Sequence, residues 1–210
     1  MSEFTNSLTL KNAKLNIDEK LIKLRDGYRE NGVPTILTDG LNELMLFVAA
    51  KKPEKILELG TATGCSGIAM LEACETSNLT TVEKLEESFI QAKKNFAEFG
   101  MEKRVVQYLG DAEEVVNELE GKFDFVFLDC NKSKYKVLLP KLKELLKKGG
   151  ILFADNVLFR GYISGEVPAP HKYHSIKNNM RLFLDMITED KDFITTVLDI
   201  GDGVSVSLKK

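Results

Sequence analysis

Oxygen-bearing side chains end two apolar runs in the second half of the chain. Asp129 closes "FDFVFLD", and Asp155 with Asn156 closes "ILFADN". If both runs are parallel strands of one sheet, the three side chains meet at its carboxyl edge, where such sheets bind their ligands. Carboxylate and amide oxygens are hard donors that suit Mg²⁺ or another divalent cation. Either aspartate alone could cap a helix or turn, but together the three residues predict a metal site.

Lys132, three residues after Asp129, is a candidate general base. Beside bound cationic groups its ammonium form would be destabilised, which lowers the pKa and lets the amine accept a proton. The stretch "NKSKYK" holds three lysines, so a solvated surface lysine is the competing interpretation.

A glycine turn is predicted within "ILELGTATGCSG", residues 56–67, between a strand and a helix. Gly60 and Gly64 allow a tight turn and close approach of a ligand to the backbone. Glu83 ends the next predicted strand, where its carboxylate could accept hydrogen bonds from both hydroxyls of an adenosine ribose, and Asp111 ends the third. The dinucleotide fingerprint G-x-G-x-x-G needs a third glycine. These residues therefore predict S-adenosylmethionine (SAM) as the cofactor, with an NAD-binding oxidoreductase as the alternative of another class.

The elements that must position these residues alternate along the chain. Predicted strands lie at 55–60, 79–83, 104–110, 123–129 and 151–156, and predicted helices lie at 65–74, 85–100, 112–121 and 135–150. Such alternation builds a parallel sheet with helices on both faces. A helix at 175–187 and strands at 193–200 and 203–210 around "GDG" predict an antiparallel hairpin at the end. The expected fold class is α/β, with a Rossmann-like, mostly parallel sheet of seven strands.

The chain has 210 residues, which fits one domain. Helices are predicted at 17–30 and 38–51, separated by Gly32 and Pro34, which break a helix. We expect a single domain, residues 1–210, in which residues 1–52 form an N-terminal helical cap and residues 53–210 form the sheet core.

Composition argues against several classes of protein. No apolar run approaches the ~20 residues of a membrane span, and the polar start "MSEFTNSLTLKNAKLNIDEK" is unlike a signal peptide, so a cytoplasmic protein is expected. The three cysteines fit neither a disulfide framework nor a zinc site. A net charge of −3 argues against binding to nucleic acid by bulk electrostatics, although a local basic patch remains open.

Six motifs occur in the order and spacing of a known family: "LELGTATG", "VE", "GDA", "LDCNKSKY", "ADNVLFRG" and "IGDG". Over about residues 30–210 the chain resembles the cation-dependent class I O-methyltransferases, which include the catechol and caffeoyl-CoA O-methyltransferases. Within that family, "NGVPTILTDG" and "DNVLFRG" most resemble the bacterial tRNA 5-hydroxyuridine methyltransferases.

The resemblance implies a class I methyltransferase fold and O-methyl transfer that depends on SAM and Mg²⁺. It implies a general base at Lys132 and metal ligands at Asp129, Asp155 and Asn156. It also implies cofactor contacts at Glu58, Gly60, Ser66, Glu83, Asp111, Ala112 and Asp129. "LDCNK" departs from the family at Cys130 and Asn131, where small or acidic residues are more common, and this predicts an altered pocket wall.

The implied acceptor carries two adjacent oxygens. The leading candidate is 5-hydroxyuridine at the wobble position of tRNA, and the alternative is a small catechol or hydroxylated phenol. Arg160, Lys172 and Lys177 belong to a segment, residues 159–179, that could contact a tRNA backbone or could lie on a solvated loop. Because the family usually forms homodimers, a homodimer is expected.

Overall fold

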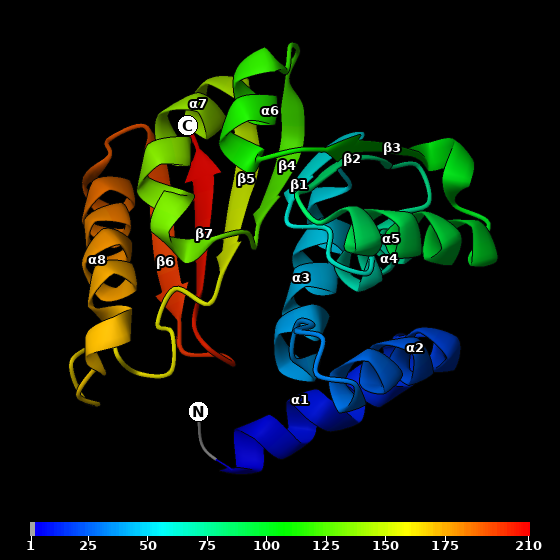
Figure 1. Cartoon of the computed structure of the whole chain (residues 1–210), viewed down its shortest axis with the longest axis horizontal. Helices are drawn as coiled ribbons and strands as arrows, with labels where there is room; N and C mark the ends of the chain where they lie inside the picture. The colour runs from blue at the N-terminus through cyan, green and yellow to red at the C-terminus, as the bar shows by residue number, and fades with distance from the viewer. Residues whose placement is uncertain (1–2) are drawn as a thin grey trace.

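The computed structural model describes residues 3–210, and its centre is one seven-stranded sheet in the order β3-β2-β1-β4-β5-β7-β6 (Figure 1). β1 to β5 are parallel, and β7 is antiparallel to both β5 and β6. This confirms the predicted fold class, including the C-terminal hairpin. The strands are β1 (Lys55–Leu59), β2 (Asn78–Glu83), β3 (Val105–Leu109), β4 (Phe123–Leu128), β5 (Leu146–Asp155), β6 (Phe193–Leu198) and β7 (Val204–Lys209).

Helices cover both faces of the sheet (Figure 1). α3, α4 and α5 lie on one face, α6, α7 and α8 lie on the other, and α1 and α2 pack against α3 and α4. The α-helices are α1 (Glu3–Asn16), α2 (Glu19–Glu30), α3 (Thr38–Lys51), α4 (Cys65–Ala73), α5 (Glu86–Glu98), α6 (Ala112–Glu118), α7 (Tyr135–Leu145) and α8 (His174–Glu189). Three 3₁₀ turns are η1 (Glu102–Arg104), η2 (Lys132–Lys134) and η3 (His171–Tyr173).

Strand periodicity divides the apolar side chains between two cores. Ile56 and Phe125 point to the face covered by α3, α4 and α5, whereas Leu57 and Val126 point to the opposite face. Successive residues of a strand alternate between the faces, so continuous apolar runs are required where both faces are covered. This explains why β1 and β4 are apolar almost throughout.

The predicted helix at 135–150 is wrong in its last turn, because α7 ends at Leu145 and β5 begins at Leu146. Leu146 pairs with Phe123 of β4, but the next pair is Ile151 with Phe125, so residues 147–150 form a bulge. Gly149 has φ +74°, which a helix does not accommodate. The leucine and lysine residues of "KLKELLKK" have the pattern of an amphipathic helix, so the sequence does not show that the helix ends at Leu145.

Helix α1 was not predicted at all, and α2 begins at Glu19, two residues later than expected. Ala13 and Ile17 are buried near the end of α1, but the segment lacks the repeated apolar stripe that identifies a helix. Asp18 caps α2, because its carboxylate accepts a hydrogen bond from Lys20 N at 2.7 Å. Within residues 3–210, no helix has the length and apolar character needed to cross a membrane.

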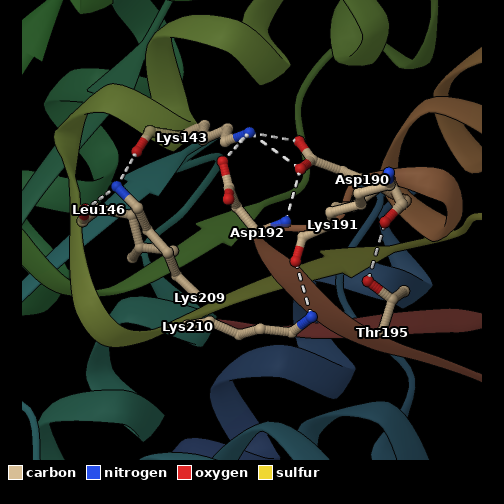
Figure 2. Close-up of polar contacts among 9 residues, drawn as sticks. Lys143, Leu146, Asp190, Lys191, Asp192, Thr195, Lys209 and Lys210 are labelled. Carbon is tan, nitrogen blue, oxygen red and sulfur yellow. Dashed lines mark hydrogen bonds and ion pairs between the residues drawn. The ribbon is translucent and has the colours of Figure 1, made fainter.

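A cluster of charged residues fastens the end of α7 to the last two strands (Figure 2). Lys209 Nζ donates hydrogen bonds to the carbonyl oxygens of Lys143, at 2.7 Å, and Leu146, at 2.8 Å. The Lys143 ammonium is 2.6 Å from Asp190 and 2.8 Å from Asp192. A cation near the last carbonyls of a helix also opposes the negative end of its dipole. The cluster therefore holds the C-terminus of the chain against the helix that precedes β5.

We predict that Lys209→Met lowers the free energy of unfolding by about 1 kcal/mol, since two charge-assisted hydrogen bonds are lost at a partly solvated position. Urea denaturation followed by circular dichroism measures the change. Lys191→Met is the matched control, because the Lys191 side chain is exposed. Equal stability of the two variants would contradict a role for the Lys209 contacts.

Candidate active site

A cavity of about 520 Å³ lies at the carboxyl ends of β1 to β5. From β1 the sheet continues to β2 and β3 on one side and to β4 and β5 on the other, so the strand order reverses between β1 and β4. Ligands bind to α/β sheets at such a switch point. The segment before α3 and the β6–β7 turn complete the wall. The lining residues are Pro34, Thr35, Ile36, Leu37, Gly60, Ala62, Val82, Glu83, Lys84, Gly110, Asp111, Ala112, Asp129, Cys130, Asn131, Lys132, Lys134, Asp155, Asn156, Phe159, Arg160 and Asp202.

Gly60 allows β1 and β4 to end against each other. Its φ is +101°, and a Cβ atom placed on it would lie 2.2 Å from Asp129 O. Asp129 N in turn donates to Leu59 O at 2.9 Å. No residue larger than glycine fits this contact, which brings the predicted cofactor turn beside the predicted metal residues.

Glu83 lines the cavity but already holds three backbone amides. Its Oε2 accepts from Ala62 N at 2.7 Å, and its Oε1 accepts from Lys84 N and Leu85 N at 2.9 and 2.8 Å. A carboxylate offers about four acceptor positions. In this arrangement about one acceptor position is left on a carboxylate that lines the cavity, and the ribose contact of Glu83 stays a prediction.

Glu58 and Ser66 lie beneath the cavity instead of on its wall. Ser66 Oγ donates to Glu58 Oε1 at 2.5 Å, and Thr81 Oγ1 donates to Glu58 Oε2 at 2.6 Å. Glu58 is fully buried, and burial, opposed by these two hydrogen bonds, raises its pKa to about 7. Neither residue is part of the cavity lining. Both support the turn from below, and the cofactor contacts implied for them stay a prediction.

Asp111 and Ala112 line the cavity at the start of α6. Asp111 caps that helix by accepting a hydrogen bond from Glu113 N at 3.0 Å, and it forms an ion pair with Lys84 at 2.9 Å. The Lys84 contact, helped by the cap, holds the pKa of Asp111 below its usual value. The carboxylate therefore stays charged at the edge of the cavity.

Asp129, Asp155 and Asn156 meet on the cavity wall, as their positions in the sequence predict. Asp155 is 5% exposed, and burial together with repulsion from Asp129 raises its pKa to about 7. Asn156 has φ +57°, which asparagine tolerates better than most residues. Among residues 3–210 no three His, Cys, Asp or Glu side chains form a cluster able to hold a metal. Two repelling carboxylates with an adjacent amide oxygen nevertheless fit a hard divalent cation.

Lys132 forms an ion pair with Asp129, with Nζ 2.7 Å from Oδ1. Burial lowers the pKa of Lys132, but the charge and hydrogen bond of Asp129 and the charge of Asp155 outweigh burial and raise it above the usual value. The protein's own charges therefore raise the pKa of Lys132. The lowering that was expected would have to come from bound cations. In the protein alone, Lys132 is the cation paired with Asp129, and it offsets part of the negative charge of the two carboxylates.

Two neighbouring positions also shape this edge. Tyr135, to which sequence reasoning gave no role, places its buried hydroxyl 2.9 Å from Leu128 O and 3.1 Å from Asp155 O. It therefore links the ends of the two strands that carry the metal candidates, although its only signal was its place in "LDCNKSKY". Cys130 lines the cavity, and burial raises the pKa of its thiol to about 12, so it contributes a neutral wall.

The loop after Asn156 contains three aromatic rings in contact, which we call the aromatic cluster: Phe159, Tyr162 and Tyr173. Tyr162 and Tyr173 are stacked, with ring centroids 5.6 Å apart, and Phe159 meets both rings edge to face. Phe159 and Arg160 have φ of +36° and +58°, values that cost energy in residues with a Cβ atom. This strained backbone brings both residues to the cavity rim.

Comparisons with known proteins agree with this geometry. The family model described as O-methyltransferase matches residues 19–210. A caffeoyl-CoA O-methyltransferase of Populus kitakamiensis is 26% identical over 171 residues, which cover 78% of this chain and 73% of that protein. The O-methyltransferase TomG of Streptomyces achromogenes, solved in complex with SAM, is 25% identical, with a TM-score of 0.83 and 100% of both chains covered. A putative caffeoyl-CoA O-methyltransferase from Staphylococcus aureus shares the fold, with a TM-score of 0.90, 24% identity, and 99% and 100% of the two chains covered.

These findings support a methyltransferase over the alternative of an NAD-binding oxidoreductase. The matched family model spans α2 to the C-terminus and includes every residue predicted for the site. The chain therefore belongs to the O-methyltransferase family and is a SAM-dependent O-methyltransferase.

Proposed function

We propose that the enzyme transfers the SAM methyl group to a hydroxyl that has a second oxygen beside it, with help from a divalent cation such as Mg²⁺. The observation that carries the proposal is the meeting of Asp129, Asp155, Asn156 and Lys132 at one end of the cavity, next to Gly60. The first three residues would hold the cation. A bound cation would lower the pKa of the acceptor hydroxyl and fix its direction.

Lys132 is the group placed to take the acceptor's proton. It must first leave its ion pair with Asp129 and release one proton to solvent, because an ammonium has no free electron pair. The hydroxyl proton then passes to Lys132 Nζ, and the oxygen forms a bond to the methyl carbon of SAM. The carbon–sulfur bond breaks with its electron pair on sulfur, and S-adenosylhomocysteine (SAH) is released.

The leading acceptor is 5-hydroxyuridine at the wobble position of tRNA, and the aromatic cluster supports it. Unpaired bases of RNA stack on aromatic side chains and arginine planes. The Tyr162–Tyr173 stack adjoins the cavity through Phe159 and Arg160. Lys172 Nζ lies 4.9 Å from the Tyr173 ring centre, so a positive charge accompanies the stacking surface.

A small catechol or hydroxylated phenol is the second candidate, and the charge of the cavity favours it. Lys84, Lys132 and Lys134 line the cavity, but each is paired with a carboxylate. Little free positive charge therefore remains for phosphates, apart from Arg160. The caffeoyl-CoA O-methyltransferases among the relatives also bear names that refer to a phenolic acceptor.

We predict that labelled SAM transfers its methyl group to total tRNA from a strain lacking this gene, in the presence of Mg²⁺ and not of EDTA. Scintillation counting of the precipitated tRNA measures the transfer, and a catechol is tested separately. Label in the catechol alone would move the function to the second candidate. Undiminished transfer in EDTA would contradict the metal model for either acceptor.

We predict that Lys132→Met lowers kcat at least about 100-fold, because positioned acid–base groups contribute about that much or more. SAM affinity, measured by calorimetry, should remain near that of the wild type. Lys136→Met is the control, since Lys136 lies outside the cavity lining. A Lys132→Met enzyme with normal kcat would remove Lys132 from the mechanism.

We predict that Tyr173→Ala raises the KM for tRNA about tenfold, since one stacked base contributes about 1–3 kcal/mol. The KM for a catechol should stay the same, because Tyr173, unlike Phe159, lies outside the cavity lining. Tyr108→Ala, at an exposed position of the edge strand β3, is the matched control. An equal rise for tRNA and catechol would show that Tyr173 supports the cavity without recognising RNA.

A further inference from the structure

We propose that Thr81, a buried residue of β2, is a positioning residue for SAM binding. It fixes the turn formed by residues 60–62 through a hydroxyl bridge between Thr61 and Glu58. This inference rests on the SAM dependence of the family and is independent of which acceptor is methylated.

The bridge consists of short hydrogen bonds among four buried side chains. Thr81 Oγ1 is 2.5 Å from Thr61 Oγ1 and 2.6 Å from Glu58 Oε2. Ser66 Oγ lies 2.5 Å from Glu58 Oε1. The four residues come from the first strand, the second strand, the turn and the start of α4. The bridge therefore joins all the elements that meet below the turn.

With Glu58 in its ionised form, counting protons fixes the direction of these bonds. Each hydroxyl has one proton, and an ionised carboxylate only accepts. Because Thr81 donates to Glu58, the proton between the two threonines must come from Thr61. Ser66 donates to the other carboxylate oxygen. Two protons are therefore directed at Glu58 and the third, that of Thr61, at Thr81. None of the three points into the cavity, and the turn faces the cavity with its backbone.

That backbone has a conformation that needs support. Gly60 has φ +101° and Ala62 has φ +45°, and left-handed backbone in a residue with a Cβ atom persists only where its surroundings enforce it. β2 provides three restraints in a row. Gly60 N and Thr61 N donate to Val82 O at 3.0 and 3.2 Å, Ala62 N donates to Glu83, and Thr61 bonds to Thr81.

Thr81 is the restraint that can be removed with least disturbance. Val82 acts through its backbone, and Glu83 itself lines the cavity, whereas Thr81 is buried and outside the lining. Valine has nearly the shape of threonine without the hydroxyl, so Thr81→Val would leave Thr61 and Glu58 without their shared partner. Since Gly60 and Ala62 line the cavity, a loosened turn should weaken binding of SAM and leave the methyl-transfer step intact.

The test compares Thr81→Val with Thr81→Ser, which restores the hydroxyl. We expect Thr81→Val to raise the Kd for SAM about tenfold by calorimetry, the effect of about one buried hydrogen bond. KM for SAM should rise in parallel, kcat should stay within about twofold, and Thr81→Ser should bind nearly as the wild type. Thr80→Val is the matched control, because Thr80 makes no side-chain hydrogen bond within the described residues.

Thr61→Val removes the same bond from the turn and serves as the second variant if Thr81→Val does not fold. If the two residues act together, the double variant should lose less affinity than the product of the single losses. Normal SAM affinity in Thr81→Val would overturn the proposal. Equal weakening in Thr81→Val and Thr81→Ser would overturn it too, since packing and not the hydroxyl would then be responsible.

Discussion

The contact between Gly60 and the backbone of Asp129 is the constraint on which the site depends. A Cβ atom at residue 60 would lie 2.2 Å from Asp129 O, so only glycine lets β1 and β4 end side by side. That contact puts the turn proposed to bind SAM next to the edge where Asp129 and Asp155 line the cavity. A methyl donor and an acceptor can react only if they are held close together and in line. The absence of a side chain at Gly60 thus allows the proposed SAM-binding turn to lie beside the proposed metal residues.

Several acidic side chains gather at this edge, and the fold compensates three of them in different ways. Glu83 accepts three backbone amides, Asp111 pairs with Lys84, and Glu58 is held by buried hydroxyls. Asp155 has no cation of its own at ion-pairing distance among the described residues, and its pKa rises to about 7 through burial and the charge of Asp129. The uncompensated negative charge therefore concentrates where a cation is proposed to bind.

Residue order predicted the sheet because apolar runs, glycine turns and acidic strand ends are local signals. Glu58 shows what such signals leave out. It lies between Leu57 and Leu59, which point to the opposite face of the sheet, so its side chain lies on the α4 side. There it accepts hydrogen bonds from Ser66 and Thr81 and is not part of the cavity lining. A motif identifies the residue, but its position in the alternation of the strand decides which face of the sheet its side chain lies on.

Other features depend on contacts between distant segments, which residue order does not reveal. The hydroxyl of Tyr135 bridges the ends of β4 and β5, and the ion pair with Asp129 raises the pKa of Lys132 in the protein alone. Helix α1 escaped prediction because Ala13 alone is buried among those of its side chains whose burial is described. In each case the information lies in packing and charge that appear only once the chain is folded.

The most direct test of the account is a crystal structure of the protein with Mn²⁺ and SAH, with anomalous diffraction used to locate the metal. The account predicts one strong anomalous peak coordinated by Asp129, Asp155 and Asn156, with Lys132 Nζ displaced from Asp129. A peak at another place in the chain, or none at this edge with SAH bound, would contradict the central claim that the carboxyl ends of β4 and β5 form a metal site beside the methyl donor.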